Sequence, residues 1–179
     1  MKAKEITRIA LFSAITAILA QLRVDIGPVP ITFQVMAVML AGLLLTPREA
    51  LLSQLVYVIM GLIGLPVYAG FRSGASILFG PTGGYLMAFP VAAFLIAILQ
   101  KRSQYSTLLS FLSTLLGLIP IYLSGWLLLS RYVGGLERAF QLGVLPFFWI
   151  DMIKALLAVF VSKAIERYKP ALLYEIRKN

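Results

Sequence analysis

The stretch VLPFFWIDMIKALLAVFV, residues 144–161, is apolar enough to cross a bilayer, and only Asp151 and Lys154 interrupt it with charge. Each charge costs about 2.5–3.5 kcal/mol at the centre of a membrane helix. The two residues are three apart, so a helix places them on one face. Such charges usually line a cavity or a pathway, where an acid beside a base can bind a small polar molecule. The alternative is a self-neutralising pair that only packs between helices.

The composition extends this interpretation to the whole chain. Of its 179 residues, 60% are hydrophobic and 13% are charged, whereas a soluble domain is about half apolar and a quarter charged. We therefore expect an all-α membrane protein with a single integral membrane domain, residues 1–179. The chain has no Cys and no His, which argues against disulfides, an imidazole base and a transition-metal site, so we expect no metal and no cofactor.

The positions of the charges predict the topology. Cutting the chain at its charges gives six spans, at about 6–22, 32–46, 50–64, 82–100, 104–130 and 141–163. Apart from Lys154, four basic residues fall on one side, namely Arg23, Arg72, Arg131 and Arg138, and the other eleven fall on the opposite side. The positive-inside rule then places both termini in the cytoplasm. The net charge of +9 resides at span ends, so we expect no nucleic-acid partner.

Two polar motifs flank the predicted outer loops. In GPTGGY, residues 80–85, Thr82, Gly83, Gly84 and Tyr85 could present backbone N–H groups at a helix start to an electron-rich ligand. The alternative is a tight turn with close helix packing. In GPVPITFQ, residues 27–34, the prolines favour an extended segment, and Gln34 could face a cavity or form an interhelical hydrogen bond.

Two further features have both a functional and a structural interpretation. Arg72, in the third predicted outer loop, could pair with a ligand carboxylate or could only flank a span. On the first helix, Ala10, Ala14, Ala17 and Gln21 share a face at helical spacing. Small residues let another helix approach closely, so this face predicts either packing within the bundle or docking of a partner membrane subunit.

Taken together, these motifs resemble those of the BioY family, the biotin-specific substrate-binding (S) components of energy-coupling factor (ECF) vitamin transporters. The resemblance covers nearly the whole chain, in order, through GPVPITFQ (27–34), LAGLLLTPR (40–48), GLPVYAG (64–70), GPTGGY (80–85) and DMIK (151–154).

The resemblance implies a six-helix bundle in the cytoplasmic membrane of a prokaryote, with a biotin pocket near the outer face. It also implies a transmembrane coupling subunit and two cytoplasmic ATPases as partners, docked through Ala10 and Ala14.

That ligand suits the acid–base pair. Biotin has a ureido ring with two N–H donors and one carbonyl acceptor, which match Asp151 and Lys154. Phe147 and Trp149 are candidate apolar walls for the rings. The ligand carboxylate could lie on the N–H groups of residues 82–85 or on Arg72.

Two rival functions remain open at the level of sequence: an S component for another vitamin, and a small intramembrane enzyme with Asp151 as its base. A purely structural oligomerising protein is disfavoured by the charged pair and the loop motifs. No Gly-Lys-Ser/Thr motif follows a glycine-rich loop, so ATP hydrolysis is expected in partner subunits and not in this chain.

Overall fold

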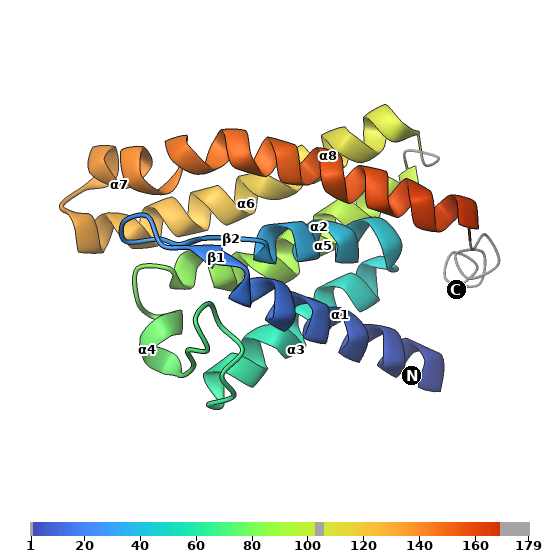
Figure 1. The fold of residues 1–179 in the computed structure, drawn as a ribbon, viewed down its shortest axis with the longest axis horizontal. Helices are drawn as coiled ribbons and strands as arrows, with labels where there is room; N and C mark the ends of the chain where they lie inside the picture. The colour runs from blue at the N-terminus through green and yellow to red at the C-terminus, as the bar shows by residue number, and fades with distance from the viewer. Residues whose placement is uncertain (1, 103–105, 169–179) are drawn as a thin grey trace.

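Residues 2–102 and 106–168 are described by a computed structural model. In this part of the chain, helices form an elongated bundle and a short β-hairpin caps one end (Figure 1). The elements in chain order are α1 (Ala3–Gln21), β1 (Arg23–Val24), β2 (Ile31–Thr32), α2 (Gln34–Leu44), α3 (Pro47–Leu62), α4 (Ala75–Leu78), α5 (Gly83–Arg102), α6 (Thr107–Val133), α7 (Leu136–Gly143) and α8 (Leu145–Tyr168).

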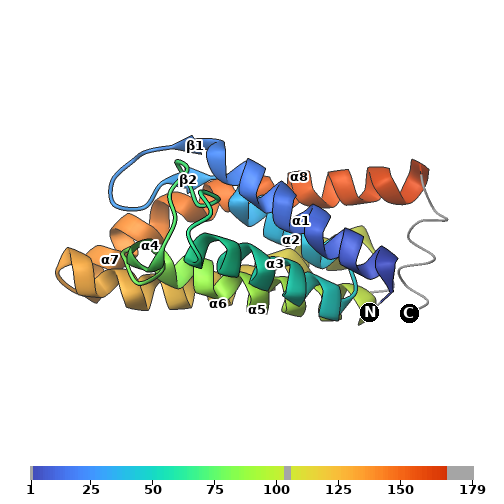
Figure 2. The ribbon, with the colours of Figure 1, turned by 90° about the horizontal axis from the view of Figure 1, so that it is seen from below.

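Different elements lie at the two ends of the bundle. The start of α1 and the end of α8 lie together at one end (Figures 1 and 2). The hairpin, α4 and α7 lie at the other end, which we call the hairpin end.

Three stretches of the described chain are long and apolar enough to cross a membrane: α5, α6 and Leu136–Tyr168, which comprises α7 and α8. The chain is therefore a mainly helical membrane protein. The predicted count of six spans and the predicted orientation of the termini are not settled by these lengths. One physical reason is that α2 and α3 are short helices, of 11 and 16 residues, and that α1 carries Lys4, Glu5 and Arg8 in its first two turns.

The polar side chains of α1 and α3 pair with one another. Ser13 Oγ donates to the carbonyl oxygen of Ser53 at 2.6 Å, and Gln54 Nε2 donates to Thr16 Oγ1 at 3.1 Å. Polar groups at membrane depth must be satisfied within the protein, so this seam holds the polar face of α1 against α3.

The opposite face of α1 is open. Ala10 and Ala14, predicted to form a docking surface, are both exposed there. Their exposure leaves the docking interpretation available, and docking remains a prediction.

The seam is closed at the end opposite the hairpin by an ion pair. Arg8 pairs with Glu49, which is only 4% exposed. Glu49 also completes a capping box with Thr46, and Pro47 occupies the first turn of α3, where it loses no helical hydrogen bond. These contacts fix the tight α2–α3 turn against α1.

The predicted bounds differ from the observed helix ends by up to five residues, and two of the differences have a local cause. The last span was expected to run unbroken over 141–163, but α7 ends at Gly143 and α8 begins at Leu145. Gly143 and Pro146 provide the break within a run that is apolar throughout, and apolarity alone hid it. The second helix begins at Gln34 and not near Thr32, because Thr32 pairs with Arg23 in the hairpin.

Candidate functional site

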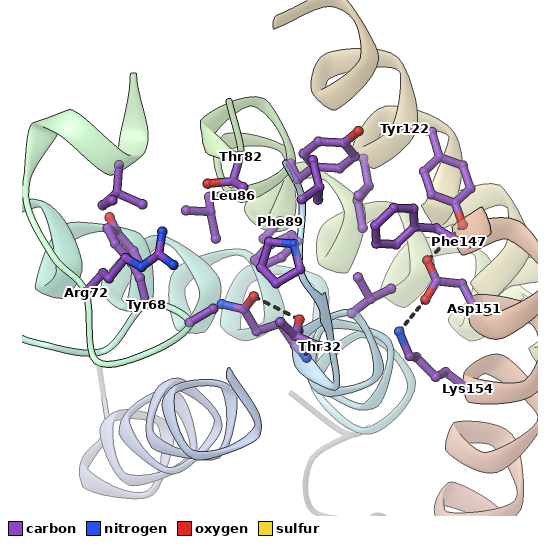
Figure 3. Close-up of a pocket in the computed structure, with 18 residues that line it drawn as sticks. Thr32, Tyr68, Arg72, Thr82, Leu86, Phe89, Tyr122, Phe147, Asp151 and Lys154 are labelled. Carbon is purple, nitrogen blue, oxygen red and sulfur yellow. Dashed lines mark hydrogen bonds and ion pairs between the residues drawn. The ribbon is translucent and has the colours of Figure 1, made fainter. Parts of the chain in front are cut away.

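A chamber opens between the hairpin, the α3–α4 loop and the neighbouring ends of α2, α5, α6 and α8 (Figure 3). Its walls are mostly apolar, with a few polar groups at separate points, which is the usual make-up of a small-molecule site. The residues that line the chamber are Val29, Pro30, Thr32, Gln34, Val35, Tyr68, Ala69, Arg72, Ile77, Thr82, Tyr85, Leu86, Phe89, Ile121, Tyr122, Phe147, Asp151 and Lys154.

The acid–base pair lies in one wall of the chamber. Asp151 is 1% exposed and Lys154 is 3% exposed, and Lys154 Nζ donates to Asp151 Oδ1 at 2.7 Å. An ammonium has three N–H donors, so this bond uses one of them. The pair is thus neutralised internally and also faces the chamber, which combines the two alternatives that the sequence left open.

A residue that the sequence analysis missed completes the pair. Tyr122 Oη, from α6, donates to Asp151 Oδ2 at 2.8 Å, so both oxygens of the buried carboxylate are engaged. The signal that could have flagged it is that its hydroxyl is the one polar side-chain group in the run 115–123. Tyr122 fixes the carboxylate orientation and leaves lone pairs on both oxygens for a further donor.

The helix break changes the depth of this pair. Counted from Leu142, beside the predicted start of the last span at about 141, Asp151 would lie roughly 13 Å along the helix. Counted from Leu145, where α8 begins, it lies roughly 9 Å along the helix. The pair therefore lies nearer the start of its own helix than the sequence indicated.

Arg72 and Tyr68 lie on the side of the chamber opposite the pair (Figure 3). In the part of the chain that the structure describes, the Arg72 guanidinium has no ion-pair partner. Burial raises the pKa of Tyr68 to about 12, so its phenol stays protonated and donates to the Val58 carbonyl oxygen at 2.7 Å. The chamber thus offers a cation at one side and an acid–base pair at the other.

Gln34 is held from both ends of its amide. Its Oε1 accepts from Thr32 Oγ1 at 3.0 Å, and its Nε2 donates to Tyr57 Oη on α3. Gln34 lines the chamber while making the interhelical bond that was the alternative interpretation.

Only part of the GPTGGY motif lines the chamber. Thr82 and Tyr85 line the chamber, and Tyr85 Oη donates to the Gly143 carbonyl oxygen at 2.9 Å. Gly83 and Gly84 lie outside the chamber lining. A Cβ on Gly83 would collide with the Leu78 backbone, and one on Gly84 with the backbone of α6, so close packing accounts for both glycines.

Of the two aromatic residues of α8 predicted to form apolar walls, only one lines the chamber. Phe147 lines the chamber and is 7% exposed, whereas Trp149 is 69% exposed and does not line it. Trp149 lies on the outer surface because two residues along a helix turn a side chain by more than half a circle. Phe89 and Ile121 supply the apolar walls that had been sought in Trp149.

Comparison with known proteins identifies the family of the chain. The family model of BioY matches residues 1–171. The chain belongs to the BioY family. This finding confirms the resemblance seen in the motifs.

The sequence of the chain is similar to those of individual family members along most of their length. The chain is 48% identical over 166 residues to the probable biotin transporter BioY of Pyrococcus horikoshii, covering 93% of this chain and 98% of that protein. It is 35% identical over 165 residues to the biotin transporter BioY of Thermotoga maritima, covering 92% and 96%.

A solved structure matches the fold. The crystal structure of the S-component for biotin from an ECF-type ABC transporter superposes with a TM-score of 0.86 at 32% identity, covering 93% of this chain and 95% of that one. The helical arrangement described above is therefore that of an S component.

Proposed function

We propose that this chain is the biotin-binding S component of an ECF-type transporter, and that it binds biotin in the chamber for uptake across the membrane. The observation that carries the proposal is the buried Asp151–Lys154 pair in the wall of a chamber, in a chain that belongs to the BioY family. The chain is a transport subunit and not an enzyme, and biotin is its cargo.

The chamber suggests one orientation for the ligand. The ureido N–H groups donate to Asp151, and the ureido carbonyl accepts from Lys154. The fused rings and the tail lie along Phe147, Ile121 and Phe89, which line the chamber between its two sides. The carboxylate then reaches the side of Arg72, where a guanidinium is available.

This orientation also accounts for selectivity. A buried charged pair that loses its ligand hydrogen bonds is left partly unsatisfied, at a cost of about 1–3 kcal/mol for each group. A vitamin without a ureido ring cannot replace those bonds, so it should bind much more weakly.

The membrane topology follows from the charge distribution. We place six spans at α1, α2, α3, α5, α6 and α8, with both termini in the cytoplasm and the hairpin end outside, in the cytoplasmic membrane of a prokaryote. The chamber near the hairpin end then receives biotin from outside the cell.

Uptake requires partners. We expect a membrane coupling subunit to dock on the exposed face of α1 at Ala10 and Ala14, and two cytoplasmic ATPases to supply the energy. The described seam of α1 against α3 supports this assignment, because it leaves the small-residue face free for close approach.

The experiment is a thermal-shift titration of the purified chain in detergent. A ligand that binds only the folded state raises the melting temperature as its concentration rises. Biotin should raise it, while thiamine and riboflavin should leave it unchanged. A rise with either of those vitamins, or none with biotin, would refute the assignment.

A further inference from the structure

The loop between α3 and α4 covers one side of the chamber. It contributes Tyr68, Ala69 and Arg72 to the lining. Figure 2 shows it rising from α3 to the outer end of α1 and the hairpin. Within it, Gly70 and Phe71 both have positive φ values, of 75° and 57°. The backbone therefore reverses sharply between Tyr68 and Arg72, which both line the chamber.

Gln21, the last residue of α1, holds this turn from both sides. Its Nε2 donates to the carbonyl oxygens of Tyr68 at 3.2 Å and Val67 at 3.4 Å. Its Oε1 accepts from the Phe71 backbone N–H at 2.9 Å. One side-chain amide thus bonds the chain before and after the reversal.

The amide is itself fixed in place. Gln21 Nε2 also lies 3.1 Å from the Ala17 carbonyl oxygen in α1, so its two N–H groups are shared among three acceptors and the side chain is anchored to its own helix. The neighbouring Arg23 adds a second contact, since its guanidinium packs against Gly70 so closely that a Cβ there would collide with it. The turn is therefore built against the end of α1.

The turn transmits this restraint to the chamber. Tyr68 N donates to the Arg72 carbonyl oxygen at 3.0 Å, which closes the reversal around residues 69–71. Releasing Gln21 would free the backbone that carries both chamber-lining side chains. Gln21 does not line the chamber, and its amide is directed at the loop and not at the exposed alanine face with which the sequence had grouped it.

We propose that Gln21 is a positioning residue that holds Tyr68 and Arg72 over the bound ligand and thereby slows ligand exit. This inference rests on the proposed function, because the ligand in question is biotin. Its effect falls on the dissociation rate, since the restraint acts on the loop that the ligand must pass.

The experiment measures release of labelled biotin from the purified full chain after addition of excess unlabelled biotin. Gln21→Leu keeps the side-chain size and removes all the amide bonds, and we expect release about tenfold faster, which corresponds to about 1.4 kcal/mol. Ser13→Ala is the matched control, because it removes a hydrogen bond from α1 to α3 without touching the loop. It should release biotin at the parent rate.

A second variant and a second readout keep the test decisive. Gln21→Glu keeps an acceptor for Phe71 but turns a carboxylate toward two carbonyl oxygens, so it should also speed release. Gln21→Leu, which removes the acceptor, should raise hydrogen exchange at the Phe71 amide. In the Arg72→Ala chain, Gln21→Leu should increase the rate of biotin release by a smaller factor than it does in the parent chain, because Gln21 acts partly through Arg72.

The outcomes separate this inference from the proposed function. If folded Gln21→Leu and Gln21→Glu chains release biotin at the parent rate, the positioning role is wrong while biotin binding stands. An equal effect of Gln21→Leu with and without Arg72 would also overturn it. If the parent chain does not bind biotin, the proposed function fails. Unchanged exchange at the Phe71 amide in Gln21→Leu would by itself refute the restraint on the turn.

Discussion

Replacing Asp151 by Asn tests the role of the acid–base pair with almost no change in shape. In the parent, the carboxylate accepts from Lys154 Nζ at 2.7 Å and from Tyr122 Oη at 2.8 Å. The amide keeps one oxygen for Lys154 and can donate to the Tyr122 hydroxyl, which accepts as well as donates. What disappears is the negative charge opposite Lys154 and the second acceptor for a ligand N–H.

The expected loss in affinity follows from these bonds. Hydrogen bonds to charged groups contribute about 1.5–3 kcal/mol and neutral ones about 0.5–1.5 kcal/mol. Losing the charge and one acceptor should therefore cost about 1.5–3 kcal/mol, which is about 10- to 150-fold weaker biotin binding. The uncompensated ammonium should also lower the melting temperature, because breaking a buried pair costs about 3–5 kcal/mol.

The assay is isothermal titration calorimetry of biotin into the purified variant, with the melting temperature recorded without ligand. Ile153→Ala, an exposed position on the same helix, is the control and should bind as the parent does. The double variant Asp151→Leu, Lys154→Met removes both charges, so it should fold at least as stably as Asp151→Asn and still not bind. Parent-like affinity in folded Asp151→Asn would refute the reasoning.

Four other changes have defined outcomes. Tyr122→Phe removes one hydrogen bond to Asp151, so biotin affinity should fall about fivefold, or about 1 kcal/mol, in the same calorimetric assay. Arg72→Gln should weaken binding of biotin more than binding of biotin amide, and equal losses would show that the guanidinium does not meet the carboxylate. Gly84→Ala should lower the melting temperature measured without ligand, because its Cβ meets the backbone of α6, and a parent-like value would contradict that packing. Ala14→Trp should leave biotin binding by the isolated chain intact but abolish uptake when the partner subunits are co-expressed, and normal uptake would exclude this face of α1 as the docking surface.

The sequence predicted one wall of the chamber well. Asp151 and Lys154 stand out because a charge within an apolar run has few structural uses, and helical spacing alone placed them on one face. Phe147 followed from the same periodicity, four residues before Asp151. For these three residues, the helical spacing in the sequence was enough to predict that they lie on one face of the helix.

Other parts of the site depend on contacts between distant segments. Tyr122 meets Asp151 only because α6 packs beside α8, and a lone tyrosine in a helix suits a core or an interface equally well. Gly83 and Gly84 have two interpretations in sequence, and their close packing against the backbones of Leu78 and α6 is visible only in the structure. The restraint of the α3–α4 loop by Gln21 joins residues about 50 positions apart, which no local pattern predicts.

A crystal structure of the chain with bound biotin would show which atoms of the ligand meet the acid–base pair. The ureido carbonyl oxygen should lie within hydrogen-bond distance of Lys154 Nζ, about 3 Å, with a ureido N–H donating to the Asp151 carboxylate. The ligand carboxylate should lie on the side of Arg72. Biotin bound in the reverse orientation, or outside the chamber with the Asp151–Lys154 pair untouched, would contradict this arrangement.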